Sequence, residues 1–238
     1  MLRQYSFSTV LIFILMMPIV VLADGFGINA TRLIYPAGAE SISVSLRNTM
    51  KALPYLVQSR VSRSVDGATP APFQVRPPLF RLDPDSTNQI RIVALSSPFP
   101  EDRESVFYFL TTAIPASTAP QRGSQQNSVN GMAQFGIGNI IKLFYRPSNL
   151  SGTSDEAQRD VQISRVAGGV QIINSSPYFV SFASIQVGGH SLKLDSPEAL
   201  MLAPFSRHTY PILSPQGLVR WKTINDEGGV NAFTYNLP

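Results

Sequence analysis

Residue types that bind metals or carry out catalysis are scarce in this chain. It has two histidines, His190 and His208, and no cysteine. A zinc site would need carboxylates to complete its ligand set, and neither histidine has a second ligand nearby at helical spacing. His190 follows two glycines, which predicts a turn, and His208 follows Arg207, which predicts a solvated position. We expect no metal site.

The common nucleophile and phosphate-binding motifs are also absent from the sequence. It contains no G-x-S-x-G and no H-E-x-x-H, and Gly136-Ile137-Gly138 lacks the third glycine of a dinucleotide loop and leads into a strand-like segment. The acid pairs Asp155-Glu156 and Asp226-Glu227 point apart on a strand or lie in turns, so they predict no general acid–base pair. We expect no catalytic residue, no cofactor and no enzymatic activity.

Residues 1–23 have the pattern of a secretory signal peptide. Arg3 supplies a positive charge, Val10 to Leu22 form an apolar stretch, and small Ala23 follows. A membrane anchor is the alternative, but about 20 apolar residues are needed to span a bilayer, and this stretch is shorter and contains Pro18. We expect Sec-dependent export, cleavage after Ala23 and no membrane insertion of the mature chain.

The charge balance is mildly positive, with 19 Lys and Arg residues against 15 Asp and Glu residues. The basic residues are dispersed, which argues against a nucleic acid partner. Because an exported chain without cysteine has no disulfides, its stability must come from buried cores.

Short segments with the period-two alternation of half-buried strands dominate the chain. Residues Ile42, Val44 and Leu46 alternate with polar residues, and the segment 90–94 does so less cleanly. The segments 55–61 and 105–111 are apolar on both sides, which is typical of central strands in a sandwich. No segment keeps helical spacing of apolar residues for three turns. The sequence predicts an all-β fold.

A polar segment and a proline-containing segment divide the chain. Residues 117–131 are rich in Gln, Ser, Asn and Gly and predict a loop, and Met132 to Arg146 predict one long strand. Pro147 to Gly152 then form a credible linker, beyond which a smaller set of strands follows. We therefore expect a signal peptide at 1–23, a first β-sandwich domain at 24–147 and a second at 148–238.

The segment Ile141-Lys142-Leu143-Phe144-Tyr145-Arg146-Pro147 closely resembles a motif of the PapD-like periplasmic chaperones of chaperone-usher pilus assembly. The resemblance covers nearly the whole mature chain. It continues in the segments 31–36, 54–59, 77–82, 103–105, 174–178 and 224–229.

This resemblance implies two immunoglobulin-like domains at an angle, in a boomerang shape with an interdomain cleft. It also implies a function: binding, folding and capping of pilus (fimbrial) subunits by donor-strand complementation, and their delivery to an outer-membrane usher. In this mechanism, which is a form of β-augmentation, a subunit that lacks one strand borrows it from the chaperone. The free protein could also cover the same edge with a second copy, as a self-capping dimer.

By the same resemblance, Arg32 and Lys142 are the two cations that bind the C-terminal carboxylate of the subunit. Charge-assisted hydrogen bonds of this kind are stronger than neutral ones. Composition alone would favour a different interpretation, in which both are solvated strand residues.

The resemblance assigns Ala133, Phe135 and Ile137 as the alternating side chains that fill the open groove of the subunit. Periodicity alone leaves a second role open, which is packing against the protein's own sandwich. Strict alternation puts Lys142 on the opposite face from Ile137, so we expect a bulge or a strong twist if both contact one subunit.

Glu104, Arg146 and Asp226 match the family's interdomain ion network, which fixes the angle between the domains. The subgroup stays open: the loop before Lys142 is longer than in short-loop members, but the chain lacks the cysteines common in long-loop members. The main alternative function is that of an exported immunoglobulin-like adhesin or a pilus structural subunit.

Overall fold

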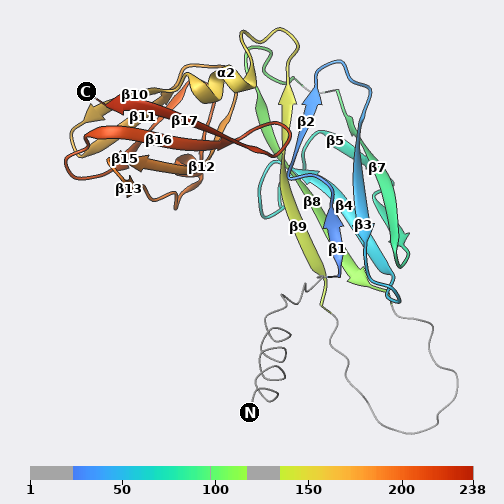
Figure 1. Cartoon of the computed structure of the whole chain (residues 1–238). Coiled ribbons are helices and arrows are strands. Elements are labelled where there is room, and N and C mark those ends of the chain that lie inside the picture. The colour runs from blue at the N-terminus through green and yellow to red at the C-terminus, as the bar shows by residue number, and fades with distance from the viewer. Residues whose placement is uncertain (1–23, 97, 117–134, 238) are drawn as a thin grey trace, which may run out of the picture.

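The computed structural model describes residues 24–96, 98–116 and 135–237. The expected signal peptide, the whole of the expected loop and Ala133 therefore lie outside the described residues. The described chain forms two β-rich domains set at an angle, and it passes from the first to the second after β9 (Figure 1).

The N-terminal domain is a sandwich of two sheets with a shared apolar core. One sheet has the order β1 (Phe26–Ile28), β3 (Ile42–Asn48), β7 (Ser86–Ala94) and β5 (Phe73–Arg76). The other has the order β2 (Arg32–Pro36), β9 (Ile137–Arg146), β8 (Ser105–Pro115), β4 (Tyr55–Ser62) and β6 (Leu79–Leu82). Only the pairing of β2 with β9 is parallel among the pairs described in this domain.

Alternating side chains build this core. In β3, Val44 and Leu46 are buried while Ser43 and Arg47 are exposed, as the period-two pattern predicts. The segment 55–61 forms β4, which lies between β8 and β6 and is therefore an inner strand, as expected. In β4, Leu56 is 40% exposed, because that face of the sheet is not covered by the facing sheet.

The C-terminal domain has a separate core and two sheets of its own. Its three-stranded sheet contains β10 (Gln162–Val166), β11 (Gly169–Asn174) and β15 (Ser206–Pro211). The facing sheet contains β13 (His190–Ser191), β12 (Val180–Val187), β16 (Gly217–Ile224) and β17 (Val230–Leu237), and β14 (Met201–Leu202) pairs with β12. The two core clusters share no residue, which defines two domains.

Two short helices, α2 (Ser154–Arg159) and α3 (Pro197–Leu200), lie in the C-terminal domain. α2 begins at a capping box, in which Thr153 accepts a hydrogen bond from the Glu156 amide and the Glu156 carboxylate accepts one from the Thr153 amide. Asp155 and Glu156 therefore lie in a helix and not on a strand or in a turn. The prediction of an essentially all-β fold is confirmed, with these helices as minor additions.

Strand β9 begins at Ile137, so the prediction of one strand from 132 to 146 was too long. Phe135 and Gly136 are described and lie outside any strand. Residues 142–145 of β9 are paired on both sides, with β2 and with β8. Residues 137–141 pair with β8 alone within the described part of the chain, which leaves an open backbone edge over five residues.

Candidate functional site

Arg32 and Lys142 lie directly opposite each other on neighbouring strands. The parallel register of β2 and β9 pairs Arg32 with Lys142, so both side chains leave the sheet on the same face. They lie where the paired half of β9 meets its open half. The structure thus places the two predicted cations together, next to the open edge.

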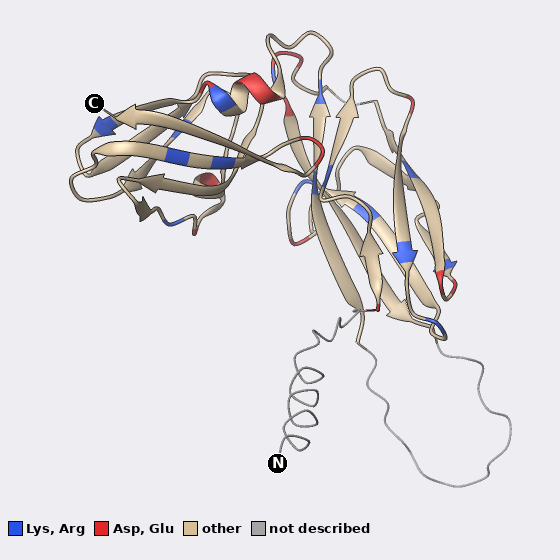
Figure 2. Ribbon diagram, viewed as in Figure 1, with Lys and Arg blue, Asp and Glu red and all other residues tan. Residues whose placement is uncertain are grey.

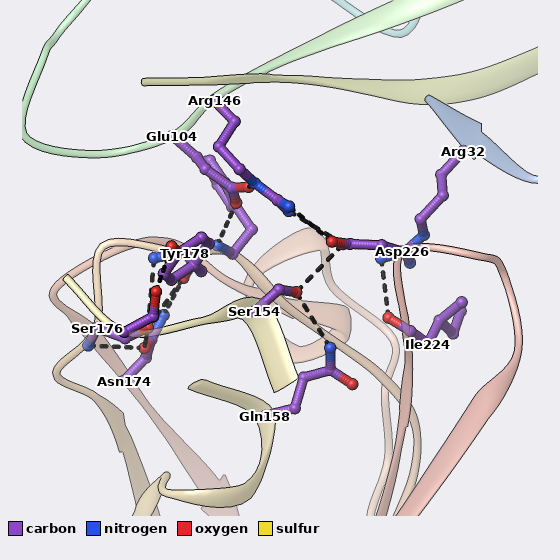
Figure 3. Close-up of polar contacts among 12 residues, drawn as sticks. Arg32, Glu104, Arg146, Ser154, Gln158, Asn174, Ser176, Tyr178, Ile224 and Asp226 are labelled. Carbon is purple, nitrogen blue, oxygen red and sulfur yellow. Dashed lines mark hydrogen bonds and ion pairs between the residues drawn. The ribbon is translucent and has the colours of Figure 1, made fainter. Parts of the chain in front are cut away.

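Contacts with the C-terminal domain hold the Arg32 guanidinium. Its Nη1 donates a hydrogen bond of 2.8 Å to the Ile224 carbonyl at the end of β16, and the group lies 5.5 Å from the centre of the Phe144 ring (Figure 3). The single bond to Ile224 leaves further guanidinium N–H groups for another acceptor. The guanidinium is therefore oriented across the domain junction, and it can still donate hydrogen bonds to another group.

The charges of these two residues are only partly compensated. Burial lowers the pKa of the Lys142 ammonium, and the neighbouring positive charge of Arg32 lowers it further. Burial also lowers the pKa of Arg32, while the negative charges of Asp226 and Glu104 act in the opposite direction. No ion pair between a carboxylate and either cation occurs among the described residues. An anion bound here would stabilise both charged forms.

A neighbouring network of ion pairs joins the two domains through Arg146, the last residue of β9. Its Nε lies 2.7 Å from Glu104 Oε1, and its Nη1 lies 2.7 Å from Asp226 Oδ2 in the turn between β16 and β17 (Figure 3). The pKa of Arg146 is raised by its hydrogen bonds and ion pairs with Asp226 and Glu104, which outweigh its burial. The structure thus brings all three predicted network residues together.

Glu104 is the most buried member of this network, with its side chain 2% exposed. Its Oε2 accepts a hydrogen bond of 2.8 Å from the backbone amide of Phe179, and its own amide donates one of 2.9 Å to the Pro177 carbonyl. Burial raises the pKa of Glu104, and the charge of Arg146 opposes that rise. Through these two hydrogen bonds, Glu104 of the first domain binds the segment 177–179 of the second domain.

That docked segment is shaped by Asn174, at the end of β11. The Asn174 amide donates to the carbonyls of Tyr178 and Ala203, at 2.7 Å and 2.9 Å, and its Oδ1 accepts from the Ser176 amide. This side chain therefore fixes the turn that presents Phe179 to Glu104 (Figure 3).

Sequence reasoning missed two residues that support Asp226 from α2. Ser154 Oγ donates to Asp226 Oδ1 at 3.2 Å and accepts from Gln158 Nε2 at 3.2 Å (Figure 3). Gln158 is 1% exposed and also accepts a hydrogen bond of 2.7 Å from Thr223. The sequence signal was the Thr153-x-x-Glu156 capping box, which marks the start of the helix.

The turn between β16 and β17 also contacts the first domain directly. It carries acidic residues and reaches the junction (Figure 2). Gly228 in this turn has a φ of +83°, and a Cβ there would collide with Thr31 Oγ1. Glycine is therefore required at this position by both its backbone conformation and the close approach of Thr31.

The predicted groove-filling residues that are described lie on the open part of the N-terminal domain. Phe135 is 83% exposed and Ile137 is 41% exposed. The register of β9 with β8 is continuous from Ile137 to Tyr145, so no bulge occurs and Ile137 lies on the opposite face from Lys142. Its face is the one that Leu143 presents to the sandwich core.

Other candidate chemistry is sparse in the described part of the chain. His190 lies in the edge strand β13 and not in a turn, and His208 packs against the Tyr210 ring at 4.7 Å. Among the described residues, no group of three or more His, Cys, Asp or Glu side chains could hold a metal ion. The helices in that part of the chain are too short and too polar to cross a bilayer.

Family models match both domains of this chain. The model of the pili and flagellar-assembly chaperone PapD N-terminal domain matches residues 25–151, and that of the pili assembly chaperone PapD C-terminal domain matches residues 156–235. The chain belongs to the PapD-like family of pili assembly chaperones. This is a family of chaperones and not of enzymes.

Several proteins named as chaperones are similar to this chain. The probable fimbrial chaperone protein ElfD of Escherichia coli is 35% identical over 208 residues, which are 86% of this chain and 83% of the relative. The E. coli chaperone DraB is 33% identical, with a TM-score of 0.75 over 90% of this chain and 97% of DraB. A chain of the Salmonella enterica SafA pilin–SafB chaperone complex is 29% identical, with a TM-score of 0.74 over 92% and 99% of the two chains.

Proposed function

We propose that this PapD-like protein is a periplasmic chaperone that binds a pilus subunit, called the client below, and caps it by donor-strand complementation. The observation that carries this proposal is the position of two adjacent, incompletely compensated cations beside an open strand edge. Similarity to a chaperone whose structure was solved together with a pilin supports the choice of client.

Arg32 and Lys142 form the anchor for the C-terminal carboxylate of the client. A carboxylate accepts hydrogen bonds on both oxygens, so it can use the free N–H groups of Arg32 and the ammonium of Lys142 together. The bond from Arg32 to the Ile224 carbonyl orients the guanidinium before the client arrives.

The open edge of residues 137–141 pairs with the client backbone. If the client's terminal carboxylate lies at Lys142, the preceding client residues lie beside 141, 140 and 139 in turn. The client strand then runs in the same direction as β9. Its residues exchange backbone hydrogen bonds with the edge that β8 leaves free.

The apolar side chains before Lys142 fill the groove of the client. Ile137 and Phe135 are exposed in the free protein, and burial of each would contribute about 1.5 to 3 kcal/mol. Ala133 extends the series. Because Ile137 lies on the core-facing side of β9, the cores of chaperone and client become continuous. Lys142 lies on the opposite face of β9 and binds the C-terminal carboxylate of the client.

The domain division and the ion network follow from the same proposal. Residues 24–147 form the domain that carries the donor strand and residues 148–238 the second, after removal of residues 1–23 in the periplasm. Glu104, Arg146 and Asp226 fix the angle between them, and the loaded complex is delivered to an outer-membrane usher. Without a client, the free protein can also pair this open edge with a second copy of itself.

Co-purification tests this proposal. A tagged full-length chain is expressed in the periplasm of its own host, and the bound proteins are identified by mass spectrometry after gel filtration. A one-to-one complex with a pilus subunit supports the proposal. Polymers of the chain itself would support the alternative of a pilus structural subunit. A monomer without client, in a strain shown to produce subunits, would reject the chaperone function.

A further inference from the structure

Three polar side chains form a row across the inner face of one N-terminal sheet. Ser59 on β4 lies directly opposite Thr111 on β8, and Thr111 lies directly opposite Asn139 on β9. Residues that are directly opposite in a sheet share one face. These three residues, called the polar row below, therefore lie at one level of the sandwich.

The polar row interrupts an otherwise apolar surface. Residues two positions away on the same strand share its face, and here all of them are apolar. They are Val57 and Val61 on β4, Phe109 and Ala113 on β8, and Ile137 and Ile141 on β9. Three strands thus place a polar residue at the same level, between two apolar levels.

The polar atoms of this row have no partners within the described part of the chain. Ser59 and Thr111 are 3% and 2% exposed, and their hydroxyl oxygens form no hydrogen bond there. The Asn139 Nδ2 atom is also buried and without a hydrogen bond. An unpaired buried polar group lowers stability, so the folding of the free domain does not explain the row.

The row ends at the open edge of the sheet. Asn139 lies in the segment 137–141, whose second edge is unpaired among the described residues. A strand added to that edge places one of its residues directly opposite Asn139 and on the same face. The client thereby extends the row by one side chain, at the boundary between the two cores.

We propose that Asn139 sets the register of the client strand, by a hydrogen bond with an uncharged polar side chain of the client residue that pairs with it. An amide both donates and accepts, which suits a hydroxyl or a carboxamide. The anchor at Arg32 and Lys142 fixes only the last client residue. A two-residue bulge in the client strand next to the anchor would keep both the anchor and the same buried face at Phe135 and Ile137, so these contacts alone do not fix the register. A buried Asn fixes register in coiled coils by the same means.

This inference rests on the proposed chaperone function, and cross-linking tests it separately. Because the natural chain has no cysteine, Ile140→Cys gives a single reactive site on the open edge. It is combined with a series of single cysteines along the last strand of the subunit that co-purifies with the chaperone. We expect one dominant cross-linked position with Asn139 present, and at least two positions, two residues apart, with Asn139→Leu. Asn139→Thr, which keeps a hydrogen-bonding group, is expected to restore one position.

A second measurement uses the free protein and needs no client. Thr111→Val keeps the shape of the side chain and removes an unpaired hydroxyl, so we expect the thermal midpoint to rise by about 2 to 4 °C. A fall in the midpoint would show that the hydroxyl is paired in the free protein and would overturn the inference. So would one cross-linked position with Asn139→Leu while capture is intact. Failure of the wild type to capture any subunit would instead reject the proposed function.

Discussion

Arg32 lies directly opposite Lys142 in the parallel pairing of β2 with β9, and its guanidinium is bonded to the Ile224 carbonyl of the other domain. Two positive side chains are therefore held side by side at the point where the domains meet. No carboxylate of the described residues forms an ion pair with either one, which is consistent with the proposed binding of an anion from a client.

Substitution of either cation should abolish client capture without unfolding the protein. We expect Arg32→Ala and Lys142→Ala to reduce the recovery of periplasmic subunit to background, because each removes half of the carboxylate anchor. Circular dichroism and thermal unfolding should be close to wild type for Lys142→Ala, since it relieves repulsion between like charges. Lys222→Ala, an exposed lysine of β16, serves as the control. Normal recovery with the double substitution would reject the anchor.

Client affinity should fall at alkaline pH, and Lys142 should be the cause. The pKa of Lys142 in the free protein lies below its usual 10.5, and a bound carboxylate would raise it, since it favours the charged ammonium. The contribution of Lys142 to affinity is therefore complete below its free-state pKa and is lost as the pH rises from there through the higher pKa of the bound state. Titrations from about pH 7 to about pH 10 would measure this loss. Lys142→Arg keeps its charge over that range, and an equal loss in this variant would contradict the assignment.

The two exposed isoleucines of β9 should differ in their importance for capture. Ile137 and Ile140 are 41% and 49% exposed, but they lie on opposite faces of the strand. Ile137→Asp puts a charge into the client groove and should abolish capture, whereas Ile140→Asp should reduce it much less. Periplasmic subunit recovery measures both, and equal effects would refute the proposed face.

Loss of Glu104 should destabilise the domain junction. Its carboxylate is almost fully buried and accepts hydrogen bonds from Arg146 and from the Phe179 amide. Glu104→Ala removes this acceptor from both donors. We expect the free energy of unfolding to fall by about 3 kcal/mol. This value is at the lower end of the range for breaking a buried ion pair, because Asp226 still neutralises Arg146. Urea unfolding would measure the change. Asp102→Ala, in an exposed pair with Arg103, is the matched control and should change the free energy of unfolding far less.

Gly228 should tolerate no side chain while Thr31 is present. Gly228→Ala is expected to cost about 1 to 2 kcal/mol from its positive φ alone, with a further cost from the collision with Thr31. Adding Thr31→Ala should recover only the second part. A double-mutant cycle measured by thermal unfolding separates the two, and strict additivity would exclude the contact between the domains.

Much of the fold could be predicted from the sequence, because alternation reports burial directly. The pattern of β3 identified Val44 and Leu46 as core residues. For β4 the apolar composition indicated an inner strand, which the topology has, but it did not show that Leu56 lies on the exposed face. Helix α2 was missed because its six residues are too few for helical periodicity to appear.

The site was only partly accessible to sequence reasoning. The family resemblance named Arg32 and Lys142, but the bond from Arg32 to Ile224 joins residues 192 positions apart and exists only in the folded domains. The polar row depends on the registers of three strands, which no local pattern in Ser59, Thr111 or Asn139 reveals. Long-range register is therefore the information that the sequence alone lacked.

The half-paired state of β9 has a consequence for the thermodynamics of capture. Because β8 already holds residues 137–141 extended, most of their backbone entropy has been lost when the protein folds, before any encounter. A flexible tail with the same side chains would lose that entropy on binding, and its affinity would be lower by the corresponding free energy. In the proposed mechanism, the rigidity of this strand would thus make a short stretch of main chain a template on which an incomplete partner can finish folding.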